Sequence, residues 1–435
     1  MKKVMHPVIY IFTSIFLMFA FPGCQDRIYE TYEVDNPVYL SWDELRMSVA
    51  DTVPEEIRQP GKIYIIGDWL LVNEFNKGIH VINNADPAAP EIISFINIPG
   101  NVDMAVKDNI LYADSYVDLV ALDISDMENI KEVARFENVF NYSLPPYESD
   151  QRIGQVDQTK GVVVDWTTEK VTEEVEPNEY FYPIRFWEYT DFAEDRMYAV
   201  AAKSGYGGNG SSAIGTGGSM ARFIIYNDVL YTIDQYNLYL FNISEPVAPV
   251  AAGMRPISWN IETVFIAHDH LFIGSTNGMH IYSLSDPYQP VWKSTYWHVT
   301  SCDPVVVEGD YAYITLRTGN TCPNDVNQLD IVNIEDLAYP YHVKTYPMAN
   351  PYGLGIDSGT LFICDGNAGL KVYDATNPYE LNEHLLAHFP EINTFDVIPY
   401  NQVLIMIGED GLYQYDYTDV TNITLLSNIP IYGED

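Results

Sequence analysis

The stretch Gly369-Leu370-Lys371-Val372-Tyr373-Asp374-Ala375-Thr376-Asn377-Pro378 joins a short apolar strand to a polar turn that ends in proline. Related strands and turns occur seven times in the chain, and the turns occupy residues 84–87, 125–127, 244–246, 285–287, 335–337, 376–378 and 418–420. Their last residues lie 40, 119, 41, 50, 41 and 42 residues apart, so the base period is 40 to 42 residues. Insertions of about 78 and about 9 residues lengthen two of the intervals. A fixed period of this length is typical of a repeat architecture.

Each repeat contains four short apolar strands separated by polar turns, as in residues 63–66, 69–72, 79–82 and 92–96 of the first unit. A small antiparallel sheet of this kind exposes apolar faces that only neighbouring sheets can cover. The sequence therefore predicts an all-β fold, a seven-bladed β-propeller of four-stranded antiparallel blades over residues 61–435. A β-sandwich with irregular turns would leave the fixed period unexplained.

The strand and turn of residues 369–378 and their copies resemble the LVIVD repeat of bacterial extracytoplasmic proteins. The segments 218–223 and 302–305 resemble a subgroup common in lipoproteins of Bacteroidetes-type bacteria. Three copies depart from the repeat, because Met127, Leu337 and Val420 replace the turn proline. The resemblance implies a β-propeller of a surface or periplasmic protein, often a lipoprotein, in a family whose members mostly have no assigned activity.

The charge balance excludes one large class of partners. The chain has 61 Asp and Glu against 22 Lys and Arg, and its formal net charge is −39. Nucleic acids and anionic lipid headgroups are polyanions, which such a surface repels. We therefore expect no nucleic-acid partner.

The N-terminus has the three-part layout of an export signal. Lys2 and Lys3 precede an apolar stretch over residues 8–21, and Gly23 stands directly before Cys24. This arrangement resembles the lipobox of bacterial lipoproteins, in which the cysteine is acylated and becomes the new N-terminus. We expect a signal peptide over residues 1–23, lipidation at Cys24 and attachment to the cell envelope, most simply the periplasmic or surface face of the outer membrane.

Two regions lie outside the repeat. Residues 24–60 are expected to form an N-terminal spacer, with a short amphipathic helix over residues 42–49. The long insertion covers about residues 141–218 and combines an aromatic-rich part with a glycine-rich linker at its end. A flap over one face and a loosely packed decoration are both consistent with this composition.

Export permits disulfides, and three cysteines follow Cys24. Cys302 and Cys322 are close enough in sequence for a local bridge, which we predict. Cys364 stands in an apolar run and is expected to be a buried thiol.

Alignment of the repeats predicts a ring of polar residues at one mouth of the central channel. In an antiparallel pair the end of the second strand and the start of the first lie at the same end of the sheet. The second strands end with Glu74, Asp114, Asp234, Ser275, Arg317, Asp365 and Glu409, and the first strands begin with Asp103, Arg222, Glu262, Asp303, Tyr352 and Asn393.

Such a ring supports two interpretations. Clustered carboxylates with Arg222 and Arg317 among them favour a bound cation, an arginine or a polar ligand, with Asp114, Asp234, Tyr352 and Asp365 as further binding candidates. Alternatively, the acids cap strand ends and pair with the two arginines to hold the ring together. We expect no cofactor, with calcium at residues 114–118 or 324–325 as the alternative.

Two functional hypotheses follow. The first is a non-catalytic, membrane-anchored platform that binds a protein or glycan partner on one face. The second is a carbohydrate-active hydrolase or lyase, with Asp103, Glu262 and Asp303 as acid and base candidates and Arg222 as the group that binds a substrate acid. The second hypothesis rests on analogy of fold, because propellers support many activities.

Overall fold

The computed structural model describes residues 28–147, 152–175, 216–217, 219–298, 304–318 and 326–433. These residues fall into two compact units, of which the smaller contains residues 28–38, 147, 152–156 and 165–175. The predicted signal peptide and Cys24, the disulfide candidates Cys302 and Cys322, and Asp303 lie outside the described residues. Within the described part of the chain, no helix has the length and apolar character needed to cross a membrane.

Seven antiparallel sheets form the larger unit within these ranges, and in each of them four consecutive strands pair in chain order. Two edge strands extend the first sheet, β13 beside β3 and β2 beside β6. We number the sheets in chain order. Sheets 1 to 3 consist of β2 (Ala50–Thr52), β3 (Pro60–Ile66), β4 (Trp69–Glu74), β5 (Gly78–Asn83), β6 (Glu91–Asn97) and β13 (Thr216–Gly217); β7 (Met104–Lys107), β8 (Ile110–Ser115), β9 (Asp118–Asp123) and β10 (Lys131–Phe136); and β14 (Phe223–Tyr226), β15 (Val229–Ile233), β16 (Asn237–Asn242) and β17 (Val250–Pro256). Sheets 4 to 7 consist of β18 (Ile261–Ala267), β19 (His270–Ser275), β20 (Gly278–Ser283) and β21 (Val291–Trp297); β22 (Val305–Glu308), β23 (Tyr311–Leu316), β24 (Gln328–Asn333) and β25 (Tyr341–Pro347); β26 (Leu354–Asp357), β27 (Thr360–Cys364), β28 (Leu370–Asp374) and β29 (Leu385–Phe389); and β30 (Thr394–Tyr400), β31 (Val403–Gly408), β32 (Gly411–Asp416) and β33 (Thr424–Pro430).

Burial explains the two kinds of strand pattern in the sequence. The second strand of a sheet is packed on both faces, so β15 is buried along its whole length. The fourth strand lies at the outer edge, so most residues of β17 are exposed. Continuous apolar runs therefore mark the inner strands, and mixed sequences mark the outer ones.

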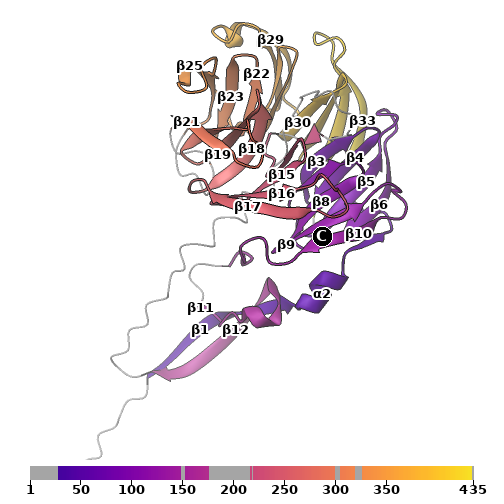
Figure 1. Ribbon diagram of the computed structural model, residues 1–435, viewed down its shortest axis with the longest axis vertical. Helices are drawn as coiled ribbons and strands as arrows, with labels where there is room; N and C mark the ends of the chain where they lie inside the picture. The colour runs from indigo at the N-terminus through magenta and orange to yellow at the C-terminus, as the bar shows by residue number, and fades with distance from the viewer. Residues whose placement is uncertain are drawn as a thin grey trace, which may run out of the picture. The chain divides into compact units, whose positions relative to one another are not determined.

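Hydrophobic clusters connect these sheets in a ring. One cluster joins sheets 1, 2 and 3, and others join sheets 3 and 4, sheets 4 to 6, and sheets 6 and 7. Ile63 of sheet 1 and Ile405 of sheet 7 belong to the cluster that joins the last sheet to the first. Figure 1 shows β3 and β30 side by side, in agreement with that cluster. Small sheets packed face to face around a ring form a β-propeller.

The repeated turn has a structural role that explains its recurrence. The carbonyl oxygen of the proline that ends the turn accepts a hydrogen bond from a side chain of the preceding sheet. Tyr112 Oη donates to Pro246 O at 2.9 Å, and Tyr231 Oη donates to Pro287 O. Ser427 Oγ donates to Pro87 O at 2.6 Å and so makes the same contact between sheets 7 and 1. The turn thus joins each of these sheets to its predecessor.

The end of the long insertion lies at the inner edge of the ring. Thr216 and Gly217 form β13, which pairs antiparallel with β3, the innermost of the four consecutive strands of sheet 1. Ser219 is buried, its hydroxyl contacts Asp396 Oδ1 of sheet 7 at 3.3 Å, and it accepts the backbone N–H of Leu354 of sheet 6 at 3.1 Å. The glycine-rich stretch was expected to be a linker, whereas its last described residues belong to sheet 1, because backbone pairing requires no side-chain pattern.

The residues before the first repeat are also structured. Trp42–Met47 form α2, as the sequence predicts, and a capping box of Ser41 and Glu44 begins the helix. β2 pairs with β6, and Ile57 forms a bridge with Ile431, so residues 50–57 belong to the propeller although they were assigned to a spacer.

The smaller unit contains a sheet of β11 (Arg152–Ile153), β1 (Ile28–Leu40) and β12 (Val162–Val175), in that order. Arg152 lies over the ring of Tyr32 and forms ion pairs with Glu30 and Glu173 at 2.9 and 3.2 Å. The sequence pattern indicates two separate regions, the residues before the first repeat and the insertion, whereas in the structure β1 pairs with strands of the insertion.

Candidate functional site

A pocket of about 310 Å³ opens between the ends of sheets 1, 2 and 3. We call it the mouth pocket. Its volume lies at the low end of the range of about 300–1,000 Å³ for small-molecule sites. Both flanks of the insertion contribute to it, and its lining includes Phe75, Asn76, Gly100, Asp103, Asp114, Tyr116, Phe140, Asn141, Arg222, Phe223, Asp234 and Gln235.

Asp114 is the second-last residue of β8 and orders the loop that leads into sheet 2. Its Oδ1 accepts the backbone N–H groups of Val102 and Asp103 at 2.8 and 3.0 Å, and the Asn101 amide at 2.9 Å. Burial raises the pKa of Asp114 to about 6, although these two N–H groups favour the charged form. Asp114 Oδ2 receives no hydrogen bond from any residue in the described ranges.

Asp103 is buried and binds backbone groups of two sheets. Its Oδ1 accepts Met104 N–H at 2.7 Å, and its Oδ2 accepts the N–H groups of Arg222 and Phe223. Burial raises the pKa of Asp103, and the nearby charge of Lys62 opposes that shift. Asp103 therefore links sheets 2 and 3 through the main chain, and it contacts the backbone of Arg222 rather than its guanidinium.

Lys62 places a second positive charge near this group. It is 2 % exposed, and its ammonium donates to Met220 O in the segment that follows β13. Burial lowers the pKa of Lys62 to about 8, and Asp103 is the nearby charge that most opposes the shift. Arg222 contributes to the pKa values of Lys62, Asp103 and Asp114, so these four charges are electrostatically coupled.

Asp234 occupies the corresponding position in sheet 3. Its Oδ1 accepts the N–H groups of Tyr236 and Asn237, both at 2.7 Å. Its Oδ2 accepts the amide of Asn141 at 2.8 Å and the hydroxyl of Tyr239 at 2.7 Å. The carboxylate thus fastens the first flank of the insertion to sheet 3.

The wall of the pocket is aromatic. The rings of Phe140 and Phe223 have centroids 6.0 Å apart, and Phe140 also meets Tyr239 edge to face at 5.6 Å. Tyr116 has φ +54°, and its ring lies so close to Gly100 that a Cβ there would be 2.4 Å from the ring carbons. A side chain at Gly100 would displace Tyr116 from the pocket.

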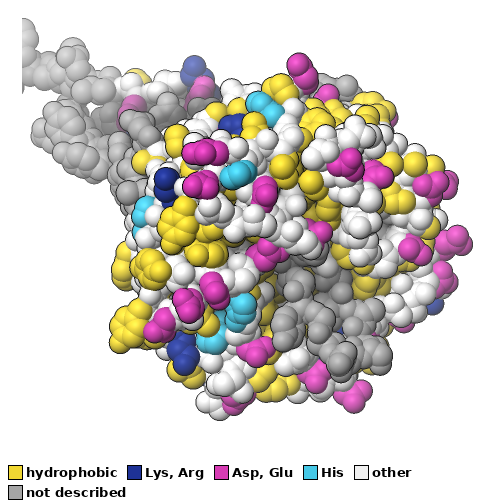
Figure 2. All heavy atoms as spheres, turned by 90° about the horizontal axis from the view of Figure 1, so that it is seen from above, with side chains coloured by type: hydrophobic (Ala, Val, Ile, Leu, Met, Phe, Trp, Pro, Cys, Tyr) yellow, Lys and Arg dark blue, Asp and Glu magenta, His cyan; other side chains and the backbone are white. Residues whose placement is uncertain are grey.

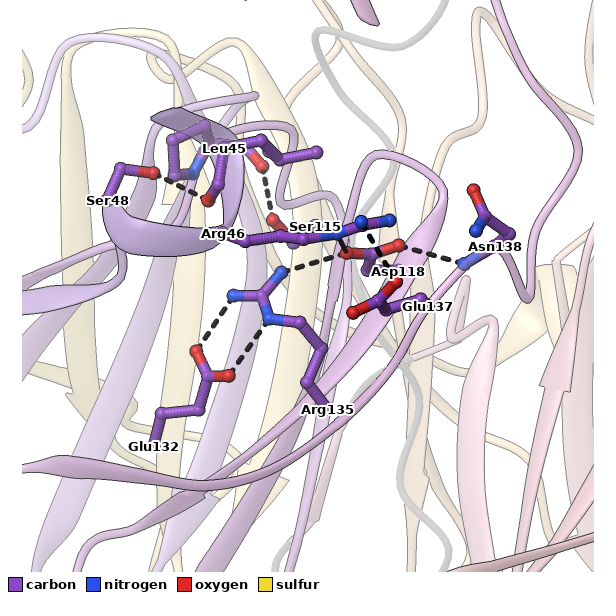
Figure 3. A network of polar contacts seen from close by, with 10 residues as sticks. Leu45, Arg46, Ser48, Ser115, Asp118, Glu132, Arg135, Glu137 and Asn138 are labelled. Atoms are coloured by element: carbon purple, nitrogen blue, oxygen red, sulfur yellow. Dashed lines mark hydrogen bonds and ion pairs between the residues drawn. The ribbon is translucent and has the colours of Figure 1, made fainter. Parts of the chain in front are cut away.

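A polar network holds α2 over the outer part of sheet 2 (Figure 3). Asp118 is buried, and its Oδ2 accepts Arg46 of α2 and Arg135 of β10, both at 3.1 Å. Its Oδ1 accepts the N–H of Asn138 at 2.9 Å. Leu45 is completely buried with Val117 and Val162 beneath the helix. The segment that carries Phe140 and Asn141 is therefore held by Asp118 through Asn138 and by Asp234 through Asn141.

Several polar side chains in the lining have unused hydrogen-bonding groups. Arg222, Gln235, Asn76 and the hydroxyls of Tyr116 and Ser143 form no side-chain hydrogen bond or ion pair within the ranges that the structure describes. Together with Asp114 Oδ2 they are among the groups that a ligand in the mouth pocket can use.

The other predicted site residues lie elsewhere in the ring. Arg317 stacks on Tyr352 with its guanidinium carbon 4.2 Å from the ring centroid. Asp365 is buried, accepts the N–H groups of Ala349 and Asn350 at 3.0 and 2.8 Å, and forms an ion pair with Lys371. None of these residues lines the mouth pocket, and neither does Glu262.

The loop over residues 114–118 was a candidate for calcium. In the structure Asp118 already accepts two arginines, and Asp114 accepts three donors through one oxygen. Across the described residues, no group of three or more His, Cys, Asp or Glu side chains is arranged to hold a metal ion. The other candidate loop, residues 324–325, lies outside those residues.

Several residues that line the mouth pocket or interact electrostatically with its charged groups were not predicted from the sequence. Phe140, Asn141 and Gln235 lie outside the alignment of repeat positions, and Lys62 and Asp396 are interior strand residues. Asp396 is fully buried, burial raises its pKa well above the usual range, and its Oδ2 has no hydrogen-bond partner. A charged residue within an otherwise apolar strand was the available signal for Lys62 and Asp396. The predicted buried thiol, Cys364, is confirmed at 0 % exposure.

The surface carries the charge expected from the composition. Figure 2 shows one face on which Asp and Glu side chains are spread among hydrophobic ones, whereas Lys and Arg are few. This distribution agrees with the formal charge of −39.

Comparison with known proteins supports the fold. No family model and no curated protein matches the sequence. Among solved structures, the chain resembles the computationally designed Ika8 protein with a TM-score of 0.50 and 6% identity over 89% of this chain and 92% of that one. PorZ, an essential bacterial surface component of the type-IX secretion system of Porphyromonas gingivalis, gives a TM-score of 0.47 and 11% identity over 88% of this chain and 40% of that one. BamB from Moraxella catarrhalis gives 0.45 and 5% over 94% and 99%. At such identities a likeness concerns the fold alone, and the chain is an all-β protein of the β-propeller type.

Proposed function

We propose that this protein is an extracytoplasmic binding platform, a closed seven-bladed propeller of LVIVD-type repeats that takes its partner in the mouth pocket. The observation that carries the proposal is the pocket itself, which combines an aromatic wall with polar groups that have no partner in the described residues. Ligand sites typically pair an apolar lining with a few polar groups of this kind. The hydrophobic cluster between sheets 7 and 1 supports a ring of seven blades.

The site depends on the long insertion. Phe140 directly precedes the insertion and Asn141 begins it, whereas Arg222 and Phe223 follow shortly after it. Insertions of this length in a compact fold frequently carry function. The repeats form the frame, and the insertion makes one part of the ring different from the rest.

Binding at the mouth can be tested with immobilised protein and a panel of defined oligosaccharides and synthetic peptides. We expect at least one class to bind and to bind less tightly to a Gln235→Ala variant. The matched control is Asn367→Ala, an exposed residue that follows the second strand of sheet 6 and lies outside the pocket. Absence of binding to every member, or equal loss in both variants, would overturn the proposal.

The envelope location rests on the N-terminal sequence. Residues 1–24 have the layout of a lipoprotein signal, and we propose that acylated Cys24 anchors the protein to the outer membrane. Metabolic labelling with a lipid precursor should label the wild type and leave Cys24→Ala unlabelled. An unlabelled, freely released wild type would contradict the anchor.

The predicted bridge between Cys302 and Cys322 is a further part of the proposal. Closing a loop of about 20 residues would stabilise the fold by about 3 kcal/mol on the chain-entropy account. Peptide mapping without reduction should find the two cysteines joined. Two free thiols in the exported protein would contradict it.

The second candidate function is a carbohydrate-active hydrolase or lyase. It is favoured by the position of Asp103 and Asp114 in the lining of one pocket, where burial raises the pKa of Asp114 to about 6, because a proton-donating carboxyl group needs a raised pKa. Incubating bound oligosaccharides with the protein and analysing the products by mass spectrometry tests it. Cleavage that is lost in Asp114→Asn would favour the enzyme, and intact ligand would favour the platform.

A further inference from the structure

We infer that the ligand of the mouth pocket is a neutral saccharide rather than a charged sugar or a peptide terminus. This inference rests on the proposed function and narrows it to one chemical class. It follows from the charge balance of the pocket, from the groups left unused there and from the shape of its wall.

The charge balance disfavours ligands of either sign. Asp103, Asp114 and Asp234 line the pocket together with the guanidinium of Arg222, and the buried ammonium of Lys62 interacts electrostatically with Asp103. The positive and negative side chains largely offset one another, so a ligand of either charge gains little net attraction. These charges lie in a partly buried setting, where electrostatic effects are stronger than in water. A neutral ligand needs no such attraction and leaves these offsetting charges undisturbed.

The unused groups suit hydroxyls. The carboxylates of Asp103 and Asp234 already accept several donors each, so they offer little to a ligand. The groups that remain include one acceptor, Asp114 Oδ2, and one donor, the guanidinium of Arg222. The amides of Gln235 and Asn76 and the hydroxyls of Tyr116 and Ser143 both donate and accept. A sugar hydroxyl also donates and accepts, so neighbouring hydroxyls can satisfy an acceptor and a donor at once.

The wall suits the face of a sugar ring. A pyranose presents C–H groups on its faces and hydroxyls around its edge. Phe140 is half-buried beside the buried ring of Phe223, and Tyr116 is also part of the lining. An apolar ring face can pack on these aromatic side chains while its hydroxyls meet the polar groups.

Matched pairs of oligosaccharides isolate the effect of charge. Methyl-esterified and free oligogalacturonates differ in negative charge, and N-acetylated and deacetylated glucosamine oligomers differ in positive charge. With full-length mature protein and calorimetry, we expect the neutral member of at least one pair to bind at least about tenfold more tightly than its charged partner.

Two variants locate that binding. Gln235→Ala should weaken it about fivefold, as expected for loss of one hydrogen bond. Phe140→Leu keeps an apolar side chain but removes the flat ring, and it should weaken binding by a similar factor. Asn367→Ala should leave it unchanged, and thermal melting of all three variants checks that they are folded.

The outcomes separate this inference from the proposed function. Tighter binding of the charged members or of peptides, still weakened by Gln235→Ala, would overturn the saccharide inference and leave the mouth pocket as the site. If neither Gln235→Ala nor Phe140→Leu weakens binding, or if no oligosaccharide or peptide binds, the proposed function is overturned as well.

Discussion

Asp114 in sheet 2 and Asp365 in sheet 6 occupy the same place in the repeat, yet their surroundings differ. Asp114 is the second-last residue of β8 and Asp365 directly follows β27, and each accepts two backbone N–H groups of the loop before the first strand of its sheet. Asp365 also has an ion pair with Lys371, whereas Asp114 has a raised pKa and a free oxygen in the mouth pocket. The repeat thus supplies a strand-end carboxylate in both sheets, but Asp365 is fully buried, whereas Asp114 lines a pocket to which residues at both ends of the insertion contribute.

The largest effect is expected at the structural carboxylate. Asp365→Ala leaves the ammonium of Lys371 and two backbone N–H groups without their acceptor, and we expect a loss of about 3 kcal/mol in the free energy of unfolding. Urea denaturation measures it. The control is Glu409→Ala, an exposed carboxylate at the related position of sheet 7 that contacts Asn393, for which a change of about 0.5 kcal/mol or less is expected. Equal effects in the two variants would break the comparison.

The second prediction concerns the pH dependence caused by Asp114. A carboxyl group with a pKa of about 6 in the folded state and about 3.9 in the unfolded state binds its proton more tightly when folded. Its stabilising contribution is complete below pH 4 and is lost as the pH rises through 6. The stability difference between wild type and Asp114→Asn should therefore fall by on the order of 2 kcal/mol between pH 4 and 7.

Denaturation curves across that pH range give the measurement. Gln235→Ala changes the same pocket without removing a titrating group, so its curve should run parallel to that of the wild type. A difference that stays constant with pH for Asp114→Asn would mean that its carboxyl group is not buried as described.

The repeat could be predicted from the sequence, because it is written in local patterns. The strand and turn of residues 369–378 recur at a fixed spacing, and burial of the inner strands produces apolar runs that are visible without a structure. The carboxylates at the strand ends, Asp114, Asp234 and Asp365, could also be aligned. Their backbone partners follow from the same geometry.

The site could be predicted only in part. The mouth pocket requires Phe140 and Arg222, which are brought together by the return of an insertion whose path no periodic pattern encodes. The pairing of β1 with β11 and of β13 with β3 depends on backbone hydrogen bonds between distant segments. Such contacts leave no signature in composition or spacing.

The third prediction concerns residues 219–223, which contact sheets 6 and 7 at one end and Asp103 at the other. Ser219 contacts Asp396 and the N–H of Leu354, while Arg222 and Phe223 a few residues later bind Asp103. Ser219→Ala leaves a buried N–H without its acceptor, and we expect a loss of about 1.5 kcal/mol in stability. Ser143→Ala, at an exposed serine of the pocket rim, should cost little. If both variants match the wild type in urea, the segment does not support the ring.

The smallest effect is expected at the helix beside sheet 2. Ser41→Ala removes the N-cap of α2, whose capping box also uses Glu44, and should cost about 1 kcal/mol. Helical content is too small to follow directly, so urea denaturation is the appropriate measurement. If Ser41→Ala weakens ligand binding but leaves the free energy of unfolding unchanged, α2 positions the pocket residues and does not stabilise the fold.

Hydrogen exchange with and without a neutral oligosaccharide tests the central claim most directly, because the repeat provides its own control. The account predicts slower exchange in residues 140–146 and 222–235 around the mouth pocket, with no change at Ala349 and Asn350, which bind the structural carboxylate of sheet 6. Equal protection at both places, or protection confined to sheets 4 to 7, would contradict it.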